Sequence, residues 1–291
     1  MPNLQQSPSA GVAQEPGRSL RRRTPVEVDS FRPSAARMYD YYLGGDHHLA
    51  ADREAADALL ATVPDIATIA RANRGFLRRV VSYATNHGID QFLDLGAGFP
   101  LAGGVPDVAL AANPDARVVA VDIDPGVVAA TQAAISTNGL PGRVGAVHAD
   151  LRDALGVLEH PVTRRLLDFE RPVAVLCLSV LHFVGGDLGR VLGPLRRAMT
   201  GGSLLAISHA TPSGATTSDG LDLGKIVRLI YDCTLTPLSF RTETDLHAAL
   251  AGLSLAKPGL VPVEQWQSAA PVAESSTNLR SLLGVVAHVP T

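Results

Sequence analysis

The residues best suited to chemistry lie in the segment Gln91 to Pro100, with the sequence Gln-Phe-Leu-Asp-Leu-Gly-Ala-Gly-Phe-Pro. Its apolar residues predict a buried strand that ends in a glycine turn. Gly96 and Gly98 have no Cβ, so backbone N–H groups can approach a ligand closely. Asp94 adds a negative charge that favours a cationic ligand, such as an ammonium or a sulfonium, and repels a pyrophosphate. A strand-to-helix turn that binds nothing is the alternative for an isolated glycine pair.

Two later segments also end in an acid. Arg117 to Ile123 is predicted to be a strand that carries Asp122 at its end, about 24 residues after Gly98, where an acid can accept hydrogen bonds from a ribose diol. Val144 to Leu151 repeats the pattern with Asp150, which can accept from an exocyclic amine. Because buried strand ends rarely keep unpaired carboxylates, three such acids favour a ligand site over packing alone.

A dinucleotide is an alternative ligand for this arrangement. Asp122 suits the ribose of NAD, but the fingerprint G-x-G-x-x-G needs a third glycine where this chain has Leu101. Asp94 would also lie beside the pyrophosphate. A nicotinamide-dependent oxidoreductase is therefore disfavoured without being excluded.

Two histidines are candidate general bases. Val173 to Ser179 is the most apolar predicted strand and suits a central parallel position, and its end carries Ser179 and His182 toward the same edge of the sheet. His209 ends the next predicted strand. An imidazole has a pKa suited to proton transfer near neutral pH. A His182 that only orients a loop is the alternative.

The segment before the glycine turn is predicted to be helical. Ser34 to Asp57 has a helical pattern that is broken at Leu43 to Asp46, and Tyr39 lies among three tyrosines of this segment. These helices either cover the ligand cleft or pack their tyrosines on the domain edge. A further basic helix is predicted from about Val63 to His87, with its arginines on a solvated face.

The motifs together resemble a known family. Asp94-Leu-Gly-Ala-Gly, Asp122-Ile and Asp150-Leu are similar to the first three motifs of class I S-adenosylmethionine-dependent methyltransferases. The match extends to a largely actinomycete family of S-adenosyl methyltransferases, formerly a domain of unknown function. The segments that carry this likeness begin at Pro33 (Pro-Ser-Ala-Ala-Arg-Met-Tyr-Asp-Tyr-Tyr-Leu-Gly-Gly), Ala70 (Ala-Arg-Ala-Asn-Arg-Gly-Phe-Leu), Val180 (Val-Leu-His-Phe-Val) and Ser208 (Ser-His-Ala-Thr).

The resemblance implies an α/β, Rossmann-like class I methyltransferase fold. Its sheet would have seven mostly parallel strands with the last strand antiparallel, plus an N-terminal helical addition. The cofactor implied is S-adenosyl-L-methionine. Family likeness implies that the following residues bind it: Gly96 and Gly98 at the methionine end, Asp94 near the ammonium, Asp122 on the ribose, Ile123 against the adenine, Asp150 and Leu151 at the adenine edge, with Ser179 and Tyr39 bordering the cleft.

The resemblance also implies an enzyme, a methyltransferase whose acceptor is expected to be the oxygen or nitrogen of a small molecule. Neither an Asn-Pro-Pro-Tyr segment nor a Pro-Cys nucleophile is present. A protein that binds the cofactor or its product S-adenosylhomocysteine without catalysis is an alternative. The chain departs from the family pattern at Asp46-His47-His48-Leu49, after the glycine pair. No metal is predicted there, because neighbouring side chains diverge and no third ligand is evident.

Composition limits the other possibilities. The chain has 291 residues, a net charge of −3 and two cysteines, so it is expected to be a cytoplasmic protein without nucleic-acid partners or a disulfide framework. No apolar run reaches the length of a membrane span. Residues 1–30 are predicted to be a disordered tail whose Arg21-Arg22-Arg23 run is solvated, residues 31–88 a helical cap, and residues 89–291 the cofactor-binding domain. The oligomeric state is not predicted.

Overall fold

The structure is a computed structural model that describes residues 29–212, 214, 216, 220–268 and 281–290. Most of the predicted 1–30 tail, including the arginine run, lies outside this part of the chain. The described part contains one mixed sheet whose strands are β1 Gln91–Leu95, β2 Arg117–Asp122, β3 Val144–His148, β4 Ala174–Leu178, β5 Leu204–Ala210, β6 Ser254–Leu255, β7 Val261–Pro262 and β8 Leu282–His288.

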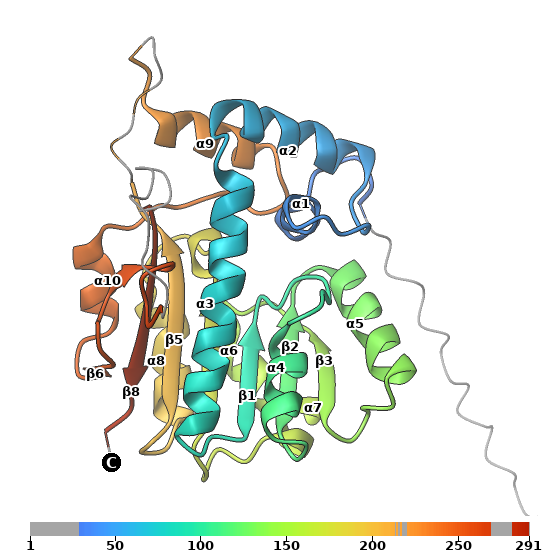
Figure 1. Cartoon of the computed structure of the whole chain (residues 1–291), viewed down its shortest axis with the longest axis vertical. Helices are drawn as coiled ribbons and strands as arrows, with labels where there is room; N and C mark the ends of the chain where they lie inside the picture. Colours follow the sequence, from blue (N-terminus) through green and yellow to red (C-terminus); the bar gives the residue numbers. More distant parts are fainter. Residues whose placement is uncertain (1–28, 213, 215, 217–219, 269–280, 291) are drawn as a thin grey trace, which may run out of the picture.

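The helices cover both faces of the sheet and also the end at which the parallel strands finish (Figure 1). In chain order they are α1 Ala35–Tyr42, α2 Ala50–Thr62, α3 Ile66–Asn86, α4 Val105–Ala112, α5 Pro125–Thr137, α6 Ala154–Glu159, α7 Pro161–Leu166, the 3-10 turn η1 Leu181–Phe183, α8 Gly189–Ala198, α9 Leu223–Asp232 and α10 Glu243–Ala249. The break expected after Leu43 separates α1 from α2, and the helix expected after Val63 is α3.

The strands are apolar on both faces because helices bury both sides of the sheet. Side chains alternate along each strand, so Leu93 and Val175 face one layer while Phe92 and Leu176 face the other. The first layer is formed by α6, α7, α8 and α10, and the second by α3, α4 and part of α5. This burial explains the uniformly apolar runs in the sequence.

The strand order is β3-β2-β1-β4-β5-β8-β6, with β7 also paired to β8. The strands β1 to β5 are parallel to one another, and β8 is antiparallel to β5. The fold prediction of a mostly parallel sheet with an antiparallel last strand is therefore confirmed. The described sheet has eight strands where seven were expected, because the two-residue β7 adds a pairing along β8.

The topology directs the chain's polar strand ends to one crevice. The chain runs outward from β1 through β2 to β3, and then returns to the other side of β1 as β4. In open α/β sheets, ligands bind outside the carboxyl ends of the strands at such a switch point. The register sets Asp94 beside Ala120 and Asp122 beside His148, so the acids of neighbouring strands end at the same edge.

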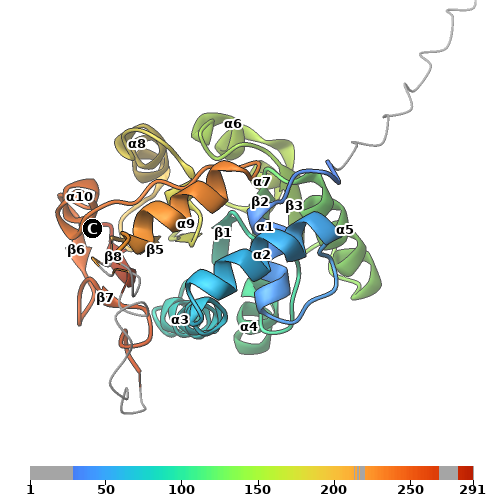
Figure 2. The same cartoon turned by 90° about the horizontal axis from the view of Figure 1, so that it is seen from above.

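Helices α1, α2 and α9 form a roof over this edge (Figures 1 and 2). Seen from above, α1 and α2 lie over the β1–β2 side and α9 lies toward β5. The roof has its own apolar cluster, in which Met38, Leu59 and Tyr231 are buried. Helix α3 joins the two parts, because its first turns pack in the roof and its later turns pack on the sheet. The domain boundary at residue 88 stays a prediction.

No helix in the described ranges is both long and apolar enough to cross a membrane.

Candidate functional site

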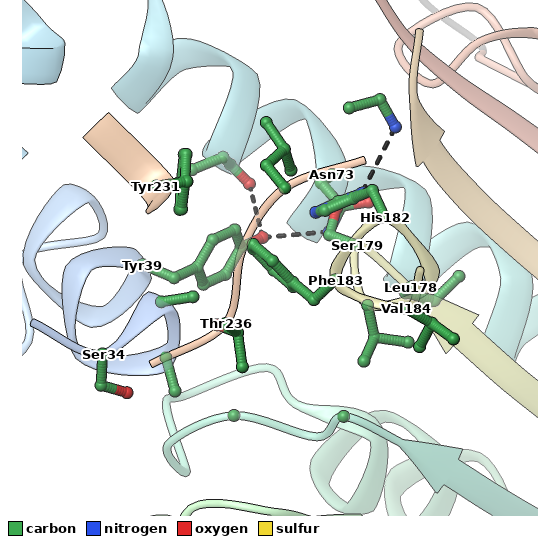
Figure 3. A pocket seen from close by; sticks show the side chains of 18 of the residues that line it. Ser34, Tyr39, Asn73, Leu178, Ser179, His182, Phe183, Val184, Tyr231 and Thr236 are labelled. Carbon is green, nitrogen blue, oxygen red and sulfur yellow. Dashed lines mark hydrogen bonds between the residues drawn. The ribbon is translucent and has the colours of Figure 1, made fainter. Parts of the chain in front are cut away.

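A cavity of about 580 Å³ lies between the carboxyl ends of the strands and the helical roof. All nine residues predicted to bind the cofactor line it, and so does His182. Figure 3 shows its centre, where Tyr39 from α1, Asn73 from α3 and Phe183 from η1 converge. The roles of these residues stay predictions, but the sequence pattern did bring them to one place.

The glycine turn follows β1 directly and requires glycine at two positions. Gly96 and Gly98 have φ angles of 71° and 67°, in the left-handed region that other residues avoid. A Cβ on Gly96 would lie 2.2 Å from Val180 Cγ2, so the turn can pass η1 only without a side chain. At Gly98 a Cβ would meet nothing within 4 Å, which leaves this backbone open toward the cavity.

Asp94 is the most perturbed acid of the site. It is buried at the end of β1, and burial raises the pKa of its carboxyl to about 7, with Arg74 opposing the rise and Asp122 adding to it. A carboxylate this poorly solvated gains from a cation brought into the cavity. Arg74 was missed by the sequence analysis, which placed the arginines of α3 on a solvated face. It lines the cavity, and its NH2 group donates to Leu101 O at 3.2 Å.

Asp122 organises the turn after β2. Its Oδ2 accepts from Gly98 N at 3.0 Å, and its Oδ1 accepts from Asp124 N at 2.9 Å. Burial raises the pKa of Asp122 to about 6, although these backbone hydrogen bonds lower it. Asp124 caps α5 by accepting from Gly126 N at 2.8 Å. Ile123, between the two acids, is 44% exposed and offers an apolar wall to the cavity.

Asp150 is paired with a neighbour in the chain. Arg152 Nε donates to its two carboxylate oxygens at 2.9 and 2.7 Å, and this contact lowers the pKa of Asp150. Both residues line the cavity with Leu151. The carboxylate is therefore ionised and held at the cavity wall, where it keeps acceptor capacity for a further hydrogen bond.

Ser179 begins a hydrogen-bonded chain that reaches the roof. The backbone of Ser179 has a φ of 55°, and its N–H donates to Ser208 Oγ at 2.8 Å. Ser208 Oγ donates to Asn73 Oδ1 at 2.7 Å, and Asn73 Nδ2 donates to Tyr39 OH at 3.1 Å. Tyr39 OH in turn donates to Ala70 O. This chain links the ends of β4 and β5 to α3 and α1, and Figure 3 shows its part at Asn73 and Tyr39.

His182 is the candidate base that faces the cavity. Its Nδ1 accepts a hydrogen bond from Ala210 N at 3.3 Å, and the other edge of the ring points toward Tyr39 and Ser179 (Figure 3). Burial, together with His209 and Arg241, lowers the pKa of His182 well below its ordinary value. The ring is therefore neutral with its proton on Nε2. In this tautomer His182 donates a hydrogen bond into the cavity.

His209 lies near the end of β5, as expected, but its side chain does not reach the cavity. It is fully buried and is not among the residues that line the cavity. Its Nδ1 donates to Ala210 O at 2.7 Å, and its Nε2 accepts from Arg241 NH1 at 3.0 Å. Burial lowers the pKa of His209 to about 4. Both ring nitrogens are engaged away from the cavity, so this geometry speaks against His209 as a base.

Arg241 fixes the loop that carries His182. It donates to the carbonyl oxygens of Leu181, Val184 and Gly186 at 3.0, 2.6 and 2.7 Å, in addition to His209. The sequence around Arg241 does not predict this role, since only the folded chain brings Arg241 within reach of residues about 60 positions earlier.

A buried ion pair inside the roof joins α1 to α2, and the sequence pattern did not predict it. Arg37 Nε donates to Asp52 Oδ2 at 2.6 Å, with both side chains almost completely buried. Asp52 also accepts from Ser34 N. Arg37 NH1 lies 3.7 Å from Asp124 Oδ2 and has no hydrogen-bond partner among the described residues. A buried guanidinium that lines the cavity with an unused N–H is suited to hold a ligand oxygen.

The two neighbouring histidines of the roof point to different partners. His47 stacks on Phe99 with ring centroids 4.5 Å apart, whereas His48 packs against Tyr41 at 4.9 Å. Across the ranges that the structure describes, no three His, Cys, Asp or Glu side chains are grouped to hold a metal ion. Trp266 is fully buried against Phe76 and Tyr83, so it belongs to the core and not to the cavity wall.

Comparison with known proteins supports the sequence motifs. A family profile described as S-adenosyl methyltransferase matches residues 21–290. A crystal structure from Thermobifida fusca YX, provisionally described as a methyltransferase, superposes with a TM-score of 0.83 at 32% identity, covering 90% of this chain and 97% of that one. A DUF574 family protein from Streptomyces avermitilis MA-4680 gives a TM-score of 0.82 at 33% identity, with coverage of 91% and 100%. No curated protein sequence matches the chain.

These matches decide between the cofactors left open by the glycine turn. The family profile covers both the strand-end acids and the helical roof, and its description names S-adenosyl methyltransferase activity and not a nicotinamide-dependent one. The chain therefore belongs to the S-adenosyl methyltransferase family, and it is a methyltransferase that uses S-adenosylmethionine.

Proposed function

We propose that this enzyme transfers a methyl group to an oxygen or nitrogen atom of a small molecule. The observation that carries the proposal is one continuous cavity that runs from the glycine turn, under the helical roof, to η1 and α9. Residues of α1 and α9 line this cavity beneath the roof, and such a covered site suits a small molecule better than a macromolecular surface. The net charge of −3 is consistent with this choice.

The cofactor would occupy the half of the cavity at the ends of β1, β2 and β3. Gly98 leaves open space for its methionine end, Asp94 offers a carboxylate to the ammonium, and Arg74 offers a cation to the carboxylate. Asp122 would accept from the ribose, and Ile123 with Leu151 would pack on the adenine, whose exocyclic amine would meet Asp150. When bound, the cofactor supplies an activated methyl group on a sulfonium sulfur.

The protein's own contribution is to orient the acceptor. Methyl transfer from a sulfonium already has a good leaving group, so alignment of the reacting atoms accounts for most of the rate that the protein adds. Ser179 and His182, at the end of β4, lie in the cavity beside the glycine turn. His182 is the candidate that would contact the acceptor, and its tautomer makes it a hydrogen-bond donor there.

Calorimetry of the purified chain with S-adenosylmethionine, S-adenosylhomocysteine and NAD tests the cofactor half. We expect micromolar binding of the first two and none of NAD. Asp122→Ala should weaken binding, whereas Glu170→Ala, an exposed acid before the amino end of β4, should not. An acceptor screen that measures release of S-adenosylhomocysteine then tests turnover. A protein that binds the cofactor but methylates no small molecule would contradict the proposed reaction.

A further inference from the structure

The charged residues that line the cavity all come from the earlier part of the chain, and we call the lining from Leu178 onward its uncharged half. Among the described residues, every Asp or Arg of the lining precedes residue 153, and the lining from Leu178 onward contains none. This second part comes from the end of β4, η1, α9 and the segment after α9. Because an isolated charge is costly to bury without a partner, an acceptor in this half is expected to be uncharged.

The uncharged half is rich in aromatic side chains. Phe183, Tyr231 and Phe240 line it, and Tyr39 of α1 lies beside Phe183, although aromatic residues make up 4% of the chain. The rings of Phe183 and Tyr231 have centroids 5.5 Å apart, and Figure 3 shows the Phe183 ring beside that of Tyr39. Aromatic walls of this kind favour a planar ring over a flexible chain, because ring pairs gain energy beyond the area that they bury.

Two polar groups of this half have unused hydrogen-bonding capacity. The Nε2 edge of His182 faces the cavity, while Nδ1 is held by Ala210 N. Thr236 Oγ1 is buried without a hydrogen-bond partner in the described part of the chain, and Thr236 lies on the opposite side of Tyr39 and Phe183 from His182 (Figure 3). Buried polar atoms are rarely left unpaired, so these two mark places where a ligand would donate or accept.

The orientation of His182 restricts the acceptor further. To take a proton at Nε2, the ring would have to place its other proton on Nδ1, directly against the N–H of Ala210. His182 is therefore a poor base for an aliphatic alcohol, which ionises only with strong assistance. A phenol or enol loses its proton to solvent much more readily, and the Nε2–H can then stabilise the resulting oxyanion.

We propose that the uncharged half binds a planar ring compound that carries a phenolic or enolic hydroxyl and no other charge, with His182 as the donor to that hydroxyl. This proposal rests on the proposed function, because it names the acceptor class of the same site. The hydroxyl proton leaves to solvent, and the oxygen lone pair then forms the new O–C bond. The C–S bond of the sulfonium breaks while the O–C bond forms, and the electron pair of the C–S bond stays on sulfur.

The test uses the full chain saturated with S-adenosylhomocysteine and titrated with naphthol in a calorimeter. Two matched ligands accompany it: a hydroxynaphthoate, which adds a carboxylate, and decahydronaphthol, which has the same carbon skeleton without aromaticity. We expect naphthol to bind about tenfold more tightly than either one. Equal or tighter binding of the carboxylate or of the saturated alcohol would overturn the proposal.

Variants separate the donor role from general packing. His182→Phe keeps a ring but removes the N–H, and it should weaken naphthol binding about three- to tenfold. His182→Gln keeps an N–H and should retain most of the affinity. Thr236→Val removes the unpaired hydroxyl at nearly constant shape and should weaken binding to a similar degree. Leu229→Ala, an exposed position on α9 outside the cavity, is the control and should change nothing.

The affinity for S-adenosylhomocysteine is measured first on each protein. It distinguishes a failure of the cofactor assignment from a failure of the proposed acceptor class. If the wild-type chain does not bind it, the cofactor assignment fails and the acceptor proposal fails with it. If it binds while naphthol is ignored, or if His182→Phe and His182→Gln behave alike, the acceptor proposal fails and the cofactor assignment stands.

Discussion

Ser34 Oγ donates a hydrogen bond to Asp124 Oδ2 at 2.8 Å, across 90 positions of sequence. Ser34 immediately precedes α1 in the roof, and Asp124 follows the strand that carries Asp122. The residue that holds the roof is thus two positions from the acid expected to bind the ribose. Both groups are buried, so the hydrogen bond is shielded from water. The hydrogen bond therefore joins the position of α1 in the roof to the segment that carries Asp122.

Ser34→Ala should weaken cofactor binding by loosening the roof. A hydrogen bond to a charged group contributes about 1.5–3 kcal/mol, and part of this will be lost from the closed state. We expect faster dissociation of S-adenosylhomocysteine in stopped-flow measurements and faster hydrogen exchange in α1. Ser136→Ala, whose hydroxyl is exposed on α5, is the control. Unchanged dissociation in Ser34→Ala would show that the roof and the cofactor half act independently.

The buried pair Arg37–Asp52 should be costly to break on one side. Removal of one partner of a buried ion pair leaves an uncompensated charge, at a cost of about 3–5 kcal/mol. Arg37→Met is therefore expected to destabilise the chain strongly in urea, and the double variant Arg37→Met, Asp52→Leu less so. Exchange measurements on α1 and α2 will show whether only the roof unfolds. A double variant that is no more stable than Arg37→Met would contradict this account.

The features that the sequence predicted are those encoded locally. The strands and their terminal acids follow from apolar runs that end in Asp94, Asp122 and Asp150, and the burial of both sheet faces explains why those runs do not alternate. The glycine turn was equally visible, because the left-handed backbone at Gly96 requires glycine. In each case the signal lies within about ten residues of the chain.

The features that the sequence did not predict depend on long-range placement. Arg74 lies on α3 among several other arginines, and their pattern did not indicate which of them turns inward. The network of Asn73 with Ser208 and Tyr39 joins residues that are 135 and 34 positions apart. His209 looked equivalent to His182 because each lies near the end of a predicted strand, but only the packing of Arg241 shows that the His209 ring is already engaged.

Asp94 should make the free protein less stable as the pH rises. Its folded pKa of about 7 lies above the ordinary value of 3.8, so the folded state binds the proton more tightly. The stabilisation of the folded state by the protonated Asp94 carboxyl is complete below about pH 4. It is lost as the pH rises to about 7, and the loss amounts to roughly 4 kcal/mol at 1.36 kcal/mol per pKa unit. Asp94→Asn should therefore be more stable than the wild type at pH 8 in urea titrations. Asp46→Asn, with a fully exposed acid, is the control.

Arg74 should set the pH at which the cofactor binds. The Asp94 carboxylate must be ionised to hold an ammonium, so affinity should fall as the pH drops below about 7. Arg74→Gln removes the cation that lowers this pKa, and the midpoint should move upward, with affinity reduced at least about tenfold by loss of the contact to the cofactor carboxylate. Arg78→Gln, one turn along α3 and outside the cavity lining, should leave both unchanged. If the midpoint of the pH dependence were the same in Arg74→Gln as in the wild type, Arg74 would have no influence on the pKa of Asp94.

Substitution of the two histidines should have different consequences. His209 hydrogen-bonds Arg241, which in turn holds three carbonyl oxygens of the segment that carries His182. His209→Phe leaves the Arg241 donor without its partner, at a cost of about 1–3 kcal/mol, and should lower the melting temperature while sparing cofactor binding. His182→Phe removes a group that faces the cavity, so it should reduce turnover of an identified acceptor with little loss of stability. Thermal unfolding, calorimetry with S-adenosylhomocysteine and turnover separate these outcomes. If His209→Phe remained fully stable but abolished turnover across the pH range, His209 would have a direct catalytic role, in contradiction to the engaged ring described above.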